Sequence, residues 1–177
     1  MRLFIAIETD EKVKEYLKSL QDKIISHDAK LSVSKGYHLT LKFLGDVPET
    51  NLEEIKAKLS EIKFTKFRLT TSDIGFFPDA KNPRVIWLGL EPHQEVKKLQ
   101  QNIDNALLNL GFEKDSRFHP HLTLARVKFV KNKNYPEMIK QLKTESIAFD
   151  VGSFVLFKSD LKPEWPVYTE LLRINLE

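Results

Sequence analysis

The tetrapeptide His-Leu-Thr-Leu occurs twice in this chain of 177 residues, at His38–Leu41 and at His121–Leu124. Successive side chains of a β-strand point to opposite faces, so each copy would place its His and Thr on one face and its two Leu on the other. The leucines can then pack into a core, while the histidine and threonine remain available for chemistry. We therefore expect two half-buried strands that carry the same polar pair.

The sequence around the two copies repeats as well. The two histidines are 83 residues apart. Two pairs of flanking segments are separated by 82 residues, namely Phe4–Glu8 with Ile86–Leu90, and Phe67–Leu69 with Phe149–Val151. Such a constant separation indicates an internal repeat of about residues 1–80 and 81–177. We expect a single domain of two related lobes, whose histidine-bearing faces turn toward a common groove.

Helices and strands are expected to alternate along the chain. Apolar residues at helical spacing predict four helices, at Glu11–Ile25, Thr50–Ile62, His93–Leu110 and Pro136–Leu142, with Gly111 as the cap of the third. Runs of β-branched and aromatic residues predict seven strands, at Leu3–Glu8, Tyr37–Leu44, Phe67–Phe76, Arg84–Leu90, His121–Val127, Ile147–Phe157 and Val167–Asn175. This interleaving is typical of an α/β or α+β protein.

Composition narrows the class of protein. Charged residues make up 30% of the chain and hydrophobic residues 41%, which is typical of a globular domain. The net charge of +3 is compatible with a phosphorylated or RNA ligand but is too small to demand one. The sequence has no cysteine, which excludes disulfides, zinc sites built on thiolates and a cysteine nucleophile. The start does not read as a signal peptide and no stretch has membrane-spanning length, so we expect a cytoplasmic protein.

The repeated polar pair favours acid–base catalysis. Histidine exchanges protons near neutral pH, and in phosphodiester hydrolysis one imidazole takes a proton from water while a second protonates the leaving oxygen. His38 and His121 are therefore the candidate catalytic residues. Thr40 and Thr123 share their faces and are candidates for binding phosphate oxygens. A single histidine in an amphipathic strand is usually structural, but the duplication favours catalysis.

A metal site is a competing interpretation. His119 and His121 are spaced to lie on one face of a strand. However, no carboxylate accompanies either motif at ligand spacing, and Pro120 interrupts the strand between these two histidines. We therefore expect neither a metal nor another cofactor.

Together these motifs resemble those of the RNA 2′,3′-cyclic phosphodiesterases, first called 2′-5′ RNA ligases, in the two-histidine phosphoesterase superfamily. Two His-x-Thr-x motifs in duplicated halves mark that superfamily. The segments that carry the closer resemblance are Arg2–Ile7, His38–Gly45, His119–Arg126, Phe157–Leu161 and Pro166–Tyr168. The resemblance covers nearly the whole chain.

The resemblance implies an α+β fold of two lobes, in which two antiparallel sheets face a central cleft and helices pack outside. It implies hydrolysis of terminal 2′,3′-cyclic phosphates of RNA to 2′-phosphates without a metal. By that analogy, His38 is the acid that protonates the departing 3′ oxygen, and His121 is the base that activates water. Thr40 and Thr123 would hold phosphate oxygens, and Arg126 matches an arginine of the family that contacts phosphate.

The sequence offers two candidates for the cation beside the histidines. In an unbroken strand Arg126 has the parity of Leu122 and Leu124, and it would face away from the groove unless the strand bulges or ends before it. Lys42 has the parity of His38 and is the alternative phosphate-binding cation.

Three aromatic residues, Tyr37, Phe43 and Trp165, are candidates for stacking on a base. The expected partners are RNA with 2′,3′-cyclic phosphate ends, tRNA fragments among them, or cyclic nucleotides. No membrane partner is expected, and the chain is expected to be a monomer. Two alternatives remain open. One is 2′-5′ ligation of RNA by the reverse reaction with the same histidines, and the other is a non-catalytic module that binds RNA ends.

Overall fold

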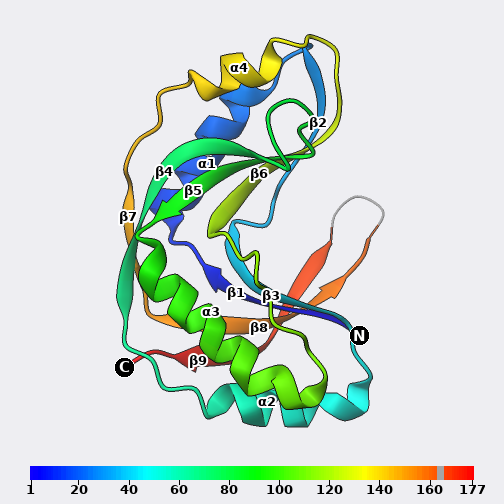
Figure 1. Ribbon diagram of the computed structural model, residues 1–177, viewed down its shortest axis with the longest axis vertical. Coiled ribbons are helices and arrows are strands. Elements are labelled where there is room, and N and C mark those ends of the chain that lie inside the picture. The colour runs from blue at the N-terminus through cyan, green and yellow to red at the C-terminus, as the bar shows by residue number, and fades with distance from the viewer. Residues whose placement is uncertain (163–165) are drawn as a thin grey trace.

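Two antiparallel sheets build the protein in the computed structural model, which describes residues 1–162 and 166–177 (Figure 1). The four-stranded sheet has the order β3 (His38–Asp46), β1 (Arg2–Glu8), β8 (Ser153–Asp160) and β9 (Val167–Asn175). The five-stranded sheet has the order β2 (Ala29–Val33), β6 (His121–Val130), β5 (Val85–Glu91), β4 (Phe67–Phe77) and β7 (Ala148–Val151). The expected α+β fold with two antiparallel sheets is confirmed.

Amphipathic helices cover the outer faces of the sheets. They are α1 (Glu11–Ile24), α2 (Leu52–Ser60), α3 (His93–Leu107) and α4 (Tyr135–Lys140), and short 3₁₀ turns at Glu49–Asn51 and Leu108–Leu110 adjoin α2 and α3. The helices α1 and α4 contact β6 and β4 of the five-stranded sheet, whereas α3 and α2 contact β3 and β9 of the four-stranded sheet (Figure 1). No helix in the described part of the chain is long and apolar enough to cross a membrane.

Each sheet takes strands from both halves of the chain. β8 and β9 join β1 and β3, while β2 and β4 join β5 and β6 (Figure 1). A boundary near residue 80 falls between β4 and β5, which are hydrogen-bonded neighbours in one sheet. The two spatial lobes are therefore not the two sequence halves. Both halves contain the order strand, helix, motif strand, helix and strand, to which the first half adds β2 and the second half adds β8 and β9.

Both motif strands contain a β-bulge at the same place. The unpaired residue is Leu41 in β3 and Leu124 in β6. The pairs that flank the two bulges are Thr40–Ala6 and Lys42–Ile5 in β3, and Thr123–Trp87 and Ala125–Ile86 in β6. Because side-chain alternation reverses at a bulge, the fifth residue after each histidine returns to the face of that histidine. These residues are Phe43 and Arg126, and both line the same cleft.

A buried polar side chain from a helix lies behind each bulge. Gln21 of α1 donates from Nε2 to the carbonyl oxygen of Leu124 at 3.0 Å and to that of Ser34 at 2.6 Å. Asp104 of α3 binds Lys42 Nζ at 2.5 Å. Gln21 and Asp104 are 83 residues apart, as are the two histidines. A helix from each half of the chain therefore supports the motif strand of the other half.

The Lys42–Asp104 ion pair is fully enclosed and well satisfied. The side chains of Lys42 and Asp104 are 5% and 4% exposed. Lys42 also donates to the carbonyl oxygen of Glu113 at 2.6 Å. The second carboxylate oxygen of Asp104 accepts from Gln100 Nε2 at 2.8 Å and from the backbone nitrogen of Asp115 at 2.9 Å. Burial of both charges is tolerable because each has several polar partners.

The fold differs from the predicted elements in two places. Ile147–Phe157, predicted as one strand, divides at Gly152 into β7 and β8, which belong to different sheets. β2 was not predicted, because its residues are mostly half-buried and do not alternate clearly. The other helices and strands lie within a few residues of their predicted bounds, and Gly111 ends the 3₁₀ turn after α3 with a φ of +86°.

Removal of one partner of the Lys42–Asp104 pair is expected to destabilise the protein. Lys42→Met would leave the carboxylate of Asp104 buried without its counter-ion, which costs about 3–5 kcal/mol in comparable cases. The double change Lys42→Met/Asp104→Leu should recover most of that loss, because no unpaired charge remains. Urea unfolding of the three proteins measures the effect, and a single substitution that costs less than about 1 kcal/mol would contradict this account.

Candidate active site

A cleft of about 530 Å³ lies between the two sheets and brings the two motifs together. His38 and Thr40 line it from β3, and His121 and Thr123 line it from β6. All four side chains are half-buried, whereas the leucines of both motifs are buried in the core. The alternation expected from the two tetrapeptides is therefore present in both strands.

The cleft is positively charged. Among the residues that the structure describes, its lining includes Arg2, Arg126 and Lys162 but no aspartate or glutamate. Serine hydroxyls from Ser32 and Ser159 add hydrogen-bonding groups on opposite walls. Such a lining attracts an anion and offers it several donors.

Arg126 lies on the cleft side of β6 because of the bulge at Leu124. Its guanidinium makes no hydrogen bond or ion pair with any residue of 1–162 or 166–177. Its charge acts on Tyr168 of β9, in the opposite sheet. Burial raises the pKa of the Tyr168 hydroxyl, and the positive charge of Arg126 partly opposes this rise. Arg126 is therefore free to bind an anion between the sheets.

The prediction that Lys42 lines the groove is wrong. The bulge at Leu41 turns Lys42 to the core side of β3, where its ammonium group binds Asp104. Lys42 is 6% exposed and is absent from the cleft lining. Strict alternation of side chains would place Lys42 in the cleft and Arg126 in the core. Both positions are reversed because each strand contains a bulge.

The imidazole of His121 has a defined tautomer. Its Nδ1 lies 2.7 Å from the carbonyl oxygen of His119. A carbonyl can only accept, so Nδ1 carries the proton and donates it to this bond. In the neutral ring, Nε2 then has a free lone pair and is an acceptor for a proton.

His38 rests on an aromatic cluster that belongs to the cleft side of the four-stranded sheet. Its ring centroid is 5.0 Å from that of Phe4, 5.4 Å from Tyr168 and 6.4 Å from Phe157. Gly36 closes the other side: a Cβ at that position would lie 2.7 Å from His38 Cε1. The absence of a side chain at residue 36 therefore allows the observed position of the imidazole.

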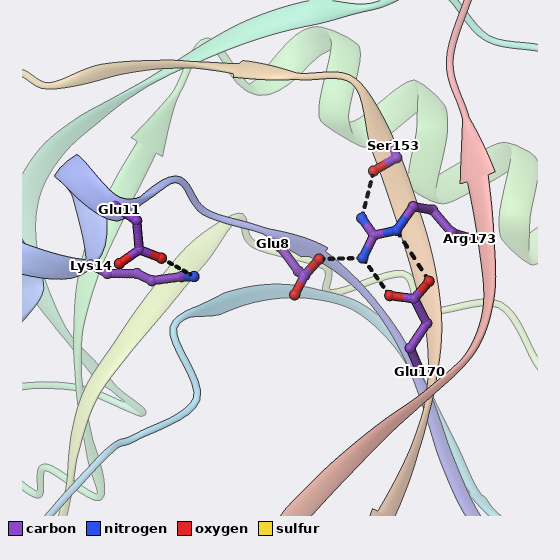
Figure 2. A network of polar contacts seen from close by, with 6 residues as sticks. All are labelled: Glu8, Glu11, Lys14, Ser153, Glu170 and Arg173. Carbon is purple, nitrogen blue, oxygen red and sulfur yellow. Dashed lines mark hydrogen bonds and ion pairs between the residues drawn. The ribbon is translucent and has the colours of Figure 1, made fainter.

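Burial dominates the protonation of both histidines. It lowers the pKa of His38 to about 4 and also lowers the pKa of His121. Glu8, which pairs with His38 across β1 and β3, opposes the shift of His38 only in part. The carboxylate of Glu8 accepts from Arg173 Nη2 at 2.6 Å, within a network that Figure 2 shows. Both histidines are consequently neutral at pH 7 when no anion is bound.

His119 belongs to an aromatic group beside His121. Its ring centroid is 4.8 Å from Trp87 and 5.4 Å from His93. Among the residues described, no three His, Cys, Asp or Glu side chains are grouped so that they could hold a metal ion. In the same part of the chain, His119 Nδ1 and Trp87 Nε1 are buried without a hydrogen-bond partner.

The aromatic candidates for base stacking differ in whether they line the cleft. Phe43 lines the cleft and is 71% exposed. Tyr37 packs against the core instead, and its hydroxyl donates to Gln21 Oε1 at 3.3 Å. Trp165 lies outside the described residues. The structure adds Arg2 and Gly36 to the site. Their positions depend on strand pairing and could not be predicted from the local sequence.

The two cleft histidines are expected to have lowered pKa values in solution, because both are largely buried. In NMR titrations, the ring signals of His38 should titrate near pH 4 and those of His121 below pH 6.5. Inorganic phosphate should raise both pKa values, because an anion between the sheets favours the imidazolium form. A pKa of His38 at or above 6.5 in the free protein would contradict the burial argument.

The same pKa shift makes stability depend on pH. Because the pKa of His38 is lowered in the folded protein, the unfolded chain binds a proton between about pH 6.5 and 4 that the folded chain does not. Stability should therefore fall by about 3 kcal/mol as the pH drops through that range. His38→Gln should remove this contribution, which unfolding curves at pH 7 and pH 4 can measure against the wild type.

The family model and the most similar curated proteins indicate the same family. Residues 9–163 match the family described as the 2′-5′ RNA ligase superfamily. The chain is 38% identical over 170 residues to the RNA 2′,3′-cyclic phosphodiesterase of Methanocaldococcus jannaschii, covering 95% of this chain and 96% of that protein. It is 34% identical over 173 residues to the protein of the same name from Archaeoglobus fulgidus, covering 97% of this chain and 98% of the relative.

Solved structures share the whole fold. The TT0787 protein of Thermus thermophilus superposes with a TM-score of 0.79 at 28% identity, covering 99% of this chain and 97% of the other. E. coli LigT in complex with 3′-AMP superposes with a TM-score of 0.78 at 26% identity, with the same coverage of the two chains. The similarity therefore includes both sheets and the cleft between them.

Proposed function

Because the chain belongs to the 2′-5′ RNA ligase superfamily, we propose that it is an RNA 2′,3′-cyclic phosphodiesterase that opens terminal cyclic phosphates to 2′-phosphates. One observation carries the proposal: two histidines from different sheets line a single cleft that offers cations and hydroxyls to an anion. A cyclic phosphodiester is an anion of suitable size, and its hydrolysis needs one base and one acid.

His121 is the proposed general base. Its Nδ1–H donates to the carbonyl oxygen of His119, so Nε2 is available to take a proton from water. The lowered pKa of His121 keeps this nitrogen unprotonated at neutral pH. The water oxygen then attacks phosphorus, and the new P–O bond forms as the proton passes to Nε2.

His38 is the proposed general acid. The bond between phosphorus and the 3′ oxygen breaks, and the imidazolium of His38 donates its proton to that oxygen. A neutral His38 in the empty cleft must first gain this proton. The bound phosphodiester favours this protonation, because a negative charge beside the ring raises the pKa of His38. The two histidines return to their starting states by exchanging protons with solvent.

Thr40, Thr123 and Arg126 are the proposed phosphate ligands. The threonines share the faces of the two histidines and offer one hydroxyl from each sheet. Arg126 offers a charged donor to the non-bridging oxygens, on which negative charge grows during attack. These donors supply the charge stabilisation that two proton transfers alone do not provide.

The proposed substrates are RNA ends that carry a 2′,3′-cyclic phosphate, tRNA fragments included, and cyclic mononucleotides. The proposed active form is a monomer, since one chain supplies both histidines and both threonines. Ligation of RNA through a 2′-5′ bond would use the same groups in reverse. A non-catalytic RNA-end binder would not need two histidines that face the same cleft.

Both histidines should be essential for hydrolysis. An oligonucleotide with a 2′,3′-cyclic phosphate end, incubated with the protein and a chelator, should yield the 2′-phosphate. His38→Ala and His121→Ala should each lower the rate about 10²- to 10⁴-fold, because each removes one proton transfer. Chromatography of the products against 2′- and 3′-phosphate standards measures the outcome.

The same assay separates the alternatives. A 3′-phosphate product, or full activity after either substitution, would contradict the assignment of the two histidines. A joined oligonucleotide in the presence of a 5′-hydroxyl strand would favour ligation. Thermal unfolding of each variant serves as the control for folding.

Arg126, and not Lys42, should control phosphate affinity. Arg126→Gln is expected to raise KM about 10- to 100-fold, because a charged hydrogen bond to the anion is lost. The folded double variant Lys42→Met/Asp104→Leu should keep the KM of the wild type, since Lys42 faces the core. Steady-state kinetics with a cyclic nucleotide compares them, and the reverse pattern would refute the assignment.

A further inference from the structure

Glu8 faces the same side of the four-stranded sheet as His38. The two residues pair across β1 and β3, and directly paired residues of an antiparallel sheet share a face. The hydroxyl of the buried Thr9 donates to the carbonyl oxygen of Tyr37 at 2.8 Å, which joins the two strands one residue beyond this pair. The strand register therefore holds the carboxylate of Glu8 next to the imidazole.

The imidazole of His38 has little other polar support. Neither of its ring nitrogens makes a hydrogen bond with any described residue, whereas His121 donates to a carbonyl oxygen. The other titratable or charged groups of the described cleft lining carry no negative charge at neutral pH. They are Tyr168, His121, Arg2, Arg126 and Lys162. Glu8 is the acidic group directly opposite His38, and its charge raises the pKa of His38 against the effect of burial.

The side chain of Arg173 reaches Glu8 along the cleft side of the sheet. Arg173 of β9 pairs with Val155 of β8, and Val155 pairs with Ala6 of β1. Ala6 pairs with Thr40, which lines the cleft, so all four residues share one face. Arg173 Nη2 donates to the carboxylate of Glu8 at 2.6 Å (Figure 2). The positive charge of Arg173 therefore acts directly on the carboxylate that His38 faces.

A second carboxylate limits the effect of Arg173. Arg173 Nε donates to Glu170 Oε1 at 3.2 Å, and Nη2 also donates to Glu170 Oε2 (Figure 2). Two carboxylates and one guanidinium leave the group with one net negative charge. The side chains of Glu8 and Arg173 are 43% and 36% exposed, so water weakens their attraction. Part of the charge of Glu8 consequently remains effective at His38.

We propose that Glu8 is a positioning residue for proton donation by His38, and that Arg173 sets the strength with which it acts, an inference that rests on the proposed function. When the cyclic phosphate binds, its charge and that of Glu8 both favour the imidazolium. Proton transfer to the 3′ oxygen returns the ring to neutrality, and the carboxylate of Glu8 keeps its bond with Arg173. Without Arg173, the full charge of Glu8 would hold the proton on His38 more tightly and slow its donation.

Two substitutions with opposite effects test this arrangement in NMR titrations, with and without sulfate as a non-titrating anion for the cleft. Glu8→Gln should lower the pKa of His38, because it removes the charge and keeps the shape of the side chain. Arg173→Met should raise that pKa, because the charge of Glu8 is no longer opposed. Each shift should be about 0.5 to 1 pH unit, since both groups are partly exposed. Adding Glu8→Gln to Arg173→Met should abolish most of the upward shift, because Arg173 acts through Glu8.

Glu11→Gln is the matched control. Glu11 is an acid of α1 that binds Lys14 at 2.7 Å and does not pair with His38 (Figure 2). This substitution removes the same charge and should leave the pKa of His38 unchanged. An unchanged pKa of His38 in Glu8→Gln, or a downward shift in Arg173→Met, would overturn the inference whether or not the protein is active.

Kinetics separate a role in proton donation from a structural role. Glu8→Gln should lower kcat for adenosine 2′,3′-cyclic phosphate about 3- to 10-fold at pH 7, because less of His38 is protonated in the complex. It should keep the wild-type rate on the analogue with sulfur in place of the 3′ oxygen, because a thiolate is a weak base and leaves without a proton. An equal loss on both substrates would indicate a structural role and overturn the inference. A wild type that hydrolyses neither substrate would overturn the proposed function, whereas the titrations judge the effect of Glu8 on His38 independently.

Discussion

The β-bulge that follows each His-x-Thr pair is the constraint on which the site depends. At Leu41 and Leu124 two successive residues turn toward the core, so that the alternation of side chains reverses. Without this reversal, Arg126 would be buried among apolar residues. Lys42 would face the cleft and would no longer bind Asp104. The backbone irregularity therefore selects which cation is available to an anion.

Contacts between the two halves of the chain lie behind both bulges. Gln21 of α1 donates to the carbonyl of Leu124 in β6, which also accepts from the backbone nitrogen of Ser34, and Asp104 of α3 binds Lys42 of β3. Because the side chains of Gln21, Lys42 and Asp104 are buried, neither helix can leave the opposite motif strand without depriving one of these polar groups of a partner. Each motif strand is thus packed against a helix from the other half of the chain.

Local sequence predicted most elements, because amphipathic periodicity reports which face of an element is buried. The leucines of both motifs, the apolar face of α1 and the bounds of β9 follow that rule. It failed at Gly152, where one apolar run leaves one sheet and enters the other, and at β2, an edge strand without clear alternation. It also assigned Lys42 to the groove, because a lysine buried in an ion pair continues the polar–apolar alternation of β3 through the bulge at Leu41.

By itself the sequence determined the chemistry: two histidines and two threonines on repeated strands, with no cysteine to offer other nucleophilic or thiolate routes. Only the tertiary structure decided how these groups act together. Strand pairing set the bulges and so chose Arg126 over Lys42, packing on Phe4 and Tyr168 lowered the pKa of His38, and the carbonyl of His119 set the tautomer of His121. The first two arise from contacts between residues far apart in the chain, and the third from a local backbone conformation that the pattern of side chains does not report.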